Sequence, residues 1–158
     1  MNFEQQKTDP ETAVLYTAIE SGKARPEWEE VALLPEGTTV LWWQWVRLTV
    51  RQGVLCRRWE AATGNEVTWQ VLLPTQLRKP FIKQVHENMT GGHLGKAKTE
   101  QQVSRRAYWP CWKTDVAQVL RSCAPCAQYH RGGPPRQTPL KPLVTGRAWE
   151  RISIDITG

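Results

Sequence analysis

The chain of 158 residues is long enough for one ordinary domain or two small ones, and its hydrophobic content of 40% argues against wholesale disorder. No apolar run approaches the length of a membrane span, and the polar N-terminus has no signal-peptide core, so we expect an intracellular protein without membrane contact. The net charge of +6 divides into −1 over residues 1–80 and +7 over residues 81–158. Nucleic acid is the commonest partner of such a basic half, and a basic surface kept for solubility is the alternative.

The N-terminal segment, residues 1–36, is polar and interrupted by three prolines. We expect a polar tail with one short helix over residues 11–20, with Asp9 as its cap and Pro10 in its first turn. The apolar residues of this helix are few, so the pattern gives little indication of what it packs against.

Residues 37–78 follow as an extension that we expect to contain one helix and a β-hairpin. Dense apolar residues predict a helix over residues 38–50 that ends before Gly53. Two β-rich runs come next, residues 54–60 and 66–73, and the intervening Thr-Gly-Asn turn predicts a hairpin. The expected helix face carries Leu41, Trp45 and Leu48.

Tryptophans are concentrated in this extension, and Trp59 and Trp69 are placed to pair across the predicted hairpin. Such a cluster fits either a base-stacking surface or the core of a small domain. We favour the core, because small domains commonly build their interior from large aromatic side chains.

A helical domain is expected over residues 79–130. Its first helix covers residues 79–89, its second covers residues 96–106, and its third begins at Pro110 and ends at Cys123. The inner stripe of the first helix carries Phe81, Ile82, Val85 and Met89.

The remaining residues divide into a linker and a strand. Prolines and glycines in residues 131–148 forbid both a helix and a central strand. Isoleucines then alternate with polar residues within 149–158, as in a β-strand. The expected fold class is α+β: a helix-plus-hairpin extension, a three-helix domain, a linker and one strand.

Two histidines and two cysteines form the pattern that carries chemistry: His86-x6-His93-x29-Cys123-x2-Cys126. Two imidazoles and two thiolates make a closed tetrahedral site for a structural zinc ion, and the Cys-x2-Cys turn brings both thiolates to one ion. Four protein ligands leave no open position for water, which indicates a structural site. The expected site joins the end of the first helix to the end of the third.

Alternative roles for these residues remain open. The cysteine pair also fits a redox motif, although such motifs usually begin a helix after a strand, whereas this pair follows a predicted helix. A rival zinc set, which leaves His86 and His93 without a role, consists of Cys111, Cys123, Cys126 and His130.

Residues from Leu73 to Arg131 resemble the H2C2 (HHCC) zinc-binding domain of integrases from gypsy-type LTR retrotransposons and retroviruses. The segments that carry the resemblance are Leu73-Pro74, Val85-His86-Glu87, Gly92-His93-Leu94-Gly95, Lys98-Thr99, Tyr108-Trp109-Pro110, Asp115-Val116 and Cys123-Ala-Pro-Cys126. Upstream, the run through Gly53-Val54-Leu55 resembles the extension that precedes this domain in gypsy-type elements. Downstream, the run from Trp149 to Asp155 resembles the first strand of the integrase catalytic core.

The resemblance implies zinc ligation by His86, His93, Cys123 and Cys126. It also implies that Asp155 is the first of three acidic residues that hold Mg²⁺ or Mn²⁺ in a complete catalytic core. The sequence ends three residues after Asp155, and two-metal chemistry needs several carboxylates. We therefore expect a non-catalytic, truncated part of a DNA-integration enzyme that works with other integrase subunits in the nucleus.

Basic residues of the second and third helices are the candidates for weak, sequence-poor, salt-dependent phosphate contacts with DNA. They are Lys96, Lys98, Arg105, Arg106, Lys113 and Arg121. An ordinary solvated helix surface is the alternative for these side chains. Two other functions compete: a zinc-stapled protein-interaction module with no nucleic-acid role, and an active enzyme that obtains its missing acidic residues elsewhere.

Overall fold

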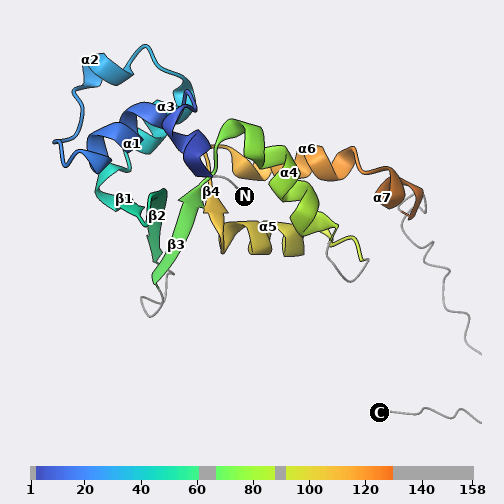
Figure 1. Ribbon diagram of the computed structural model, residues 1–158. Coiled ribbons are helices and arrows are strands. Elements are labelled where there is room, and N and C mark those ends of the chain that lie inside the picture. The colour runs from blue at the N-terminus through green and yellow to red at the C-terminus, as the bar shows by residue number, and fades with distance from the viewer. Residues whose placement is uncertain (1–2, 61–66, 88–91, 130–158) are drawn as a thin grey trace, which may run out of the picture.

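A four-stranded sheet joins two groups of helices in the computed structural model, which describes residues 3–60, 67–87 and 92–129 (Figure 1). The expected α+β class is confirmed. The elements are η1 (Phe3–Lys7), α1 (Ala13–Glu20), α2 (Trp28–Val31), α3 (Glu36–Trp42), η2 (Trp45–Arg47), β1 (Leu48–Arg51), β2 (Val54–Glu60), β3 (Val67–Leu72), α4 (Thr75–His86), α5 (Lys96–Ser104), β4 (Ala107–Tyr108), α6 (Trp112–Arg121) and α7 (Ala124–Tyr129).

Strand β1 replaces the last part of the helix expected over residues 38–50, so that prediction is wrong beyond α3 and η2. Arg51 pairs with Val54 at the end of an antiparallel ladder. The two residues between them have positive φ, 50° at Gln52 and 73° at Gly53. A two-residue turn of this kind matches the twist of the strands on either side. Hydrogen bonding to β2 therefore overrides the helical spacing of the apolar residues.

Strands β2 and β3 form the predicted antiparallel hairpin. Trp69 lies opposite Arg58, whereas Trp59 lies opposite Thr68. Since alternate residues of a strand point to opposite faces, the two tryptophans lie on opposite faces of the hairpin and do not pair. The predicted turn over residues 63–65 lies outside the described residues.

The first 36 residues, expected as a polar tail, contribute three helical segments and part of the core. Leu15 and Val31 are completely buried, and Tyr16 is 1% exposed. Gln6 anchors the segment: its amide nitrogen donates to the carbonyl oxygens of Leu55 (3.0 Å) and Leu72 (2.6 Å), and its amide oxygen accepts from the Leu55 N–H (2.8 Å). A polar side chain thus joins this segment to the sheet.

Helices α4, α5 and α6 enclose a second core, whose members include Phe81, Ile82, Val103, Trp109 and Val116. Helix α4 begins at Thr75, four residues before the expected start. Strand β4 follows α5 and pairs in parallel with β3, which the sequence did not predict. Leu72 belongs to the core that contains Leu15, and the adjacent Leu73 belongs to the core between the three helices, so the end of β3 connects the two cores.

None of the helices in the described ranges is long and apolar enough to span a membrane. The predicted linker over residues 131–148 and the predicted strand over residues 149–158 lie outside the described part of the chain.

Candidate metal centre

Four side chains at one end of the three-helix core, the end away from the sheet, meet at one point (Figure 1). His86 is the last residue of α4, and His93 lies in the segment that leads to α5. Cys123 lies between α6 and α7, and Cys126 lies in α7. The nitrogen and sulfur atoms that they offer all lie within 4.8 Å of one another. Residues up to 40 positions apart in sequence therefore share one small volume.

The separations among these atoms fit a tetrahedral ion. His86 Nε2 lies 3.0 Å from His93 Nδ1, Cys123 Sγ lies 3.2 Å from His93 Nδ1, and Cys126 Sγ lies 3.3 Å from His86 Nε2. A zinc ion with N at about 2.0 Å and S at about 2.3 Å has ligand–ligand separations of about 3.3–3.8 Å. The widest separation, up to 4.8 Å, would shorten by about 1 Å in that geometry, and the donor set is one that zinc prefers.

His86 is fixed in the orientation that a metal ligand needs. Its Nδ1 lies 2.8 Å from the carbonyl oxygen of Leu94, and its own carbonyl accepts from the Leu94 N–H at 2.9 Å. A carbonyl only accepts, so Nδ1 carries the proton and Nε2 offers its lone pair to the centre. With the ring 2% exposed, this hydrogen bond sets both tautomer and direction.

The cysteines are placed by the junction of α6 and α7. The Cys123 N–H donates to the Leu120 carbonyl at 3.2 Å, and the Cys123 carbonyl accepts from Ala127 at 3.0 Å. Burial, with further contributions from the Cys123 thiol, raises the pKa of the Cys126 thiol. Without a metal the Cys126 thiol keeps its proton at neutral pH. A bound cation takes the place of such protons.

This His2Cys2 centre lies within a segment that matches a known family. Residues 73–131 match the integrase zinc binding domain. All four converging residues lie in the matched interval. The chain is also 32% identical over 90 residues to "Uncharacterized protein K02A2.6" of Caenorhabditis elegans. The aligned residues make up 56% of this chain and 7% of that protein. The chain thus spans a small part of its relative's length.

The match to the integrase zinc binding domain, together with the convergence of the four side chains, gives both histidines a role, whereas the rival ligand set leaves them without one. Cys111 is exposed at the N-terminal end of α6, with a positive φ of 59°, and is not among the converging residues. His130 of that rival set lies outside the described residues. The redox interpretation leaves unexplained why two imidazoles lie within about a hydrogen bond's length of the two thiols.

Other segments that carried the resemblance have structural roles in this domain. The indole of Trp109, 1% exposed, donates to the carboxylate of Asp115 at 2.7 Å and links β4 to the first turn of α6. Tyr108 accepts a hydrogen bond from the side chain of Gln44 at 3.1 Å. These residues orient α6, and through α6 they place Cys123.

The six basic candidates within the matched segment are all exposed, but they do not form a single cluster. Lys96 and Arg121 line a hollow of about 400 Å³ beside the His2Cys2 centre. Arg105 and Arg106 lie at the opposite end of α5 from Lys96. The two other candidates are Lys98 of α5 and Lys113 of α6.

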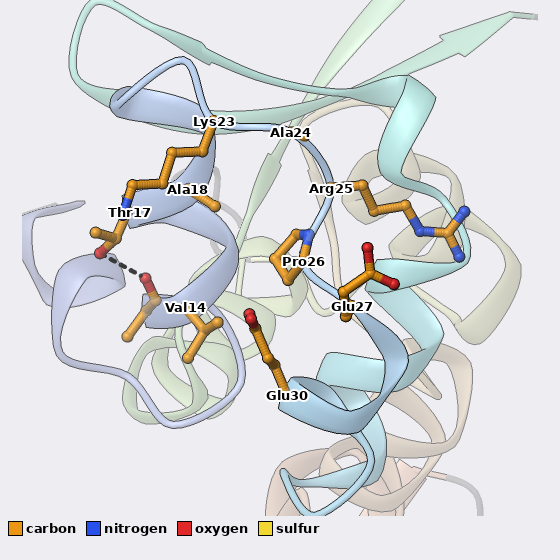
Figure 2. A pocket seen from close by; sticks show the side chains of 10 residues that line it. Val14, Thr17, Ala18, Lys23, Ala24, Arg25, Pro26, Glu27 and Glu30 are labelled. Carbon is orange, nitrogen blue, oxygen red and sulfur yellow. Dashed lines mark hydrogen bonds between the residues drawn. The ribbon is translucent and has the colours of Figure 1, made fainter.

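A further hollow, outside the zinc-binding domain, lies between α1 and the segment before α2 (Figure 2). Small apolar side chains such as Ala18 and Pro26 line it beside the charged Glu27 and Glu30. The Arg25 guanidinium lies 3.3 Å from the centre of the Trp42 ring. The hollow contains none of the converging residues, and Asp155, the expected catalytic carboxylate, lies outside the described ranges.

Proposed function

We propose that this chain is the zinc-stapled part of a retrotransposon integrase, which contacts DNA and helps to assemble integrase subunits. The observation that carries the proposal is the convergence of His86, His93, Cys123 and Cys126 within a segment that matches the integrase zinc-binding domain. The ion's role is structural, because four protein ligands leave it no position for water or substrate.

The proposed zinc ion stabilises the three-helix core. It joins the last residue of α4 to the junction of α6 and α7, two points that the apolar core alone holds only through side-chain packing. Structural zinc contributes on the order of 10 kcal/mol to folding in small domains. A core of this size needs such a contribution, because small domains bury little surface.

The proposed DNA contact rests on charge. Residues 81–158 carry a net charge of +7, and the six basic candidates are exposed on and beside α5 and α6. Contacts of this kind go to phosphates, so we expect weak binding with little sequence preference. Each neutralised phosphate should contribute about −0.9 to the slope of log K against log salt.

Charge reversal at Arg105 and Arg106 tests this contact. We expect R105E/R106E to weaken duplex binding several-fold at low salt, and to leave zinc content and thermal stability unchanged. The matched control is K79E/K83E, which makes the same change of charge at two exposed positions of α4. Equal effects of the two double variants would contradict a specific contact at Arg105 and Arg106 and indicate only a general electrostatic attraction between the basic protein and DNA.

A protein-interaction module without a nucleic-acid role is the second candidate. Large apolar side chains near α3 favour it: Trp43 is 68% exposed, Val46 is 89% exposed and Leu33 is 96% exposed. Trp28, which is 44% exposed, lies beside Trp43 with the ring centroids 6.3 Å apart, and adjoining exposed apolar side chains are typical of a protein-contact surface. Unmeasurable duplex affinity at low salt, together with intact zinc binding, would favour this candidate over the first.

We further propose that the chain alone performs no strand transfer. Over the described residues, the His2Cys2 group is the one set of metal-ligating side chains that converges, and it has no carboxylate. A strand-transfer assay of the purified chain with Mg²⁺ or Mn²⁺ tests this proposal, and formation of joined DNA product would overturn it. We expect the protein to act in the nucleus beside other integrase subunits, which fractionation and co-purification would test.

A further inference from the structure

A hollow of about 500 Å³ lies between the outer half of the β2–β3 hairpin and helices α5 and α6, away from the His2Cys2 centre. Aromatic and polar side chains from all of these elements line it. They include Arg57, Trp59, Gln70, Tyr108, Trp112 and Lys113.

The register of the hairpin explains why these side chains share one face. Arg57 pairs with Gln70, and alternation places Leu55, Arg57 and Trp59 on the same face of β2. Leu55 is completely buried beneath the N-terminal segment, whereas Trp59, at the other end of the strand, is 36% exposed. The inner half of the face is therefore core, and the outer half forms the floor of the hollow.

Two buried polar atoms of this floor have no hydrogen-bond partner among the described residues. They are the Oε1 atom of Gln70 and the Nε atom of Arg57. Gln70 is 2% exposed, and its amide nitrogen is held by the carbonyl oxygen of Ser104. A buried acceptor and a buried donor are thus left without partners on directly opposite residues of two strands, at a cost that a ligand hydrogen-bonded to them would remove.

The rest of the lining favours a planar, anionic ligand. The Arg57 guanidinium lies 3.8 Å from the centre of the Tyr108 ring, while Trp59 and Trp112 supply further aromatic surface. Lys113 adds a cation at the edge. The carboxylate of Glu100 also lines the hollow, but it lies 3.9 Å from the ammonium group of Lys96, which partly offsets its charge.

We propose that this hollow binds one unpaired nucleobase of a DNA strand, with Gln70 Oε1 accepting from the base edge and Arg57 Nε donating to it. Every base carries neighbouring donors and acceptors on its edge and a flat face that stacks on aromatic side chains. Lys113 contacts the adjoining phosphate. The inference rests on the proposed contact with nucleic acid and adds to it a preference for unpaired over paired bases.

The experiment compares two single strands of equal charge: an oligo(dT) of roughly 12 nucleotides, within the range of known single-strand sites, and an abasic strand of the same length. The full chain is titrated with each at one fixed low salt concentration, and binding is followed by fluorescence anisotropy. We expect oligo(dT) to bind roughly 5- to 100-fold more tightly, as stacking of one base implies. Equal affinity for the two strands would overturn the inference.

Variants on the two faces of the hairpin sharpen the test. Trp59→Thr should abolish the preference for oligo(dT), whereas Trp69→Thr should retain it, because Trp69 is equally exposed, at 37%, on the opposite face. If Trp59→Thr fails to fold, Lys113→Gln, at an exposed helix position, should weaken binding to oligo(dT), and no effect would count against the site. Loss of the preference in Trp69→Thr as well would also overturn the inference.

The failure of this inference is distinguishable from that of the proposed function. If R105E/R106E weakens duplex binding while oligo(dT) and the abasic strand bind equally, the proposed base site is contradicted and the proposed phosphate contact is supported. If the protein binds neither duplex nor single strands, both the base site and the proposed DNA contact are contradicted.

Discussion

The carboxylate of Asp9 accepts the first backbone N–H of α4, from Thr75, at 2.8 Å across 66 positions of sequence. Its other oxygen accepts from the Glu11 N–H at 3.1 Å. One buried side chain, 6% exposed, therefore shapes the turn before α1 and also satisfies the start of the helix that ends at His86. The N-terminal segment and the zinc-binding region are joined by this contact.

Replacement of Asp9 should destabilise the protein more than an exposed acidic substitution. Asp9→Ala removes acceptors from both N–H groups, and loss of a helix cap costs roughly 0.5–2 kcal/mol. We expect a lower midpoint of urea unfolding with an unchanged slope. Glu29→Ala, at an exposed position of α2, is the control and should leave the midpoint nearly unchanged. An equal effect of the two substitutions would contradict the capping role.

Removal of the metal ligands should unfold the three-helix core. We expect His86→Ala and Cys126→Ala to abolish zinc binding and reduce helical circular dichroism, while Cys111→Ala and His130→Ala leave both unchanged. The physical reason is that the ion would connect α4 to the α6–α7 junction, as the converging atoms indicate. Metal content by atomic emission, together with circular dichroism, checks the prediction.

A chelator provides the corresponding test on the unaltered sequence. Stripping the ion should lower the melting temperature and the helix signal together, and restored zinc should recover both. A protein that loses all bound metal with an unchanged melting curve would contradict the structural role of the centre.

Although Gln6 lies in a polar segment, its replacement by an apolar side chain should lower the stability of the protein strongly. Gln6→Leu keeps much of the volume but leaves the carbonyl oxygens of Leu55 and Leu72 and the Leu55 N–H without their partner. Each unsatisfied buried group costs about 1–3 kcal/mol, so we expect a loss of at least ~2 kcal/mol in the free energy of unfolding. Gln84→Leu, at an exposed position of α4, is the control.

The metal centre could be predicted from sequence because zinc binding depends on the types of the residues and on the short spacing between them. Only a few side chains bind zinc, and the pair Cys123 and Cys126 has a spacing that brings two thiolates to one ion. The fold around Gln6 could not be predicted in this way. Its burial depends on strand carbonyls 49 and 66 positions away, and nothing near Gln6 in the sequence signals them.

The strands show the same division between local and distant causes. The β2–β3 hairpin was predictable from two β-rich runs around a turn, because each run supplies the backbone hydrogen-bond partners of the other. Strand β4 has only two residues, Ala107 and Tyr108, and exists because β3 offers a free edge to it. Strand β1 was missed because Leu41, Trp45 and Leu48 fit a helical period equally well.

Gly37 should not tolerate a side chain, although alanine is the better helix former. A Cβ atom at position 37 would overlap the carboxylate of Glu11, which pairs with Arg78 of α4. Gly37→Ala should therefore displace Glu11 and weaken this ion pair, with a loss of stability instead of the gain expected from propensity. In the Arg78→Ala background the carboxylate is freer to move, so the same substitution should cost less, and a double-mutant cycle by urea unfolding measures the difference.

The phenol of Tyr16 should make the protein sensitive to alkaline pH. Its hydroxyl donates toward the Gly53 carbonyl and the Glu20 carboxylate, each at 3.1 Å, and burial of the ring is the main cause that raises its pKa in the folded state. A phenol in the unfolded chain ionises near pH 10, so this contribution to stability is complete below about pH 10 and is lost as the pH rises through the higher folded pKa. Tyr16→Phe has no such ionisation. We expect it to be less stable near neutral pH, since the hydroxyl contacts are lost, and to lose stability less steeply above pH 10. Melting temperatures measured across this range check the prediction, and parallel curves for the two proteins would contradict it.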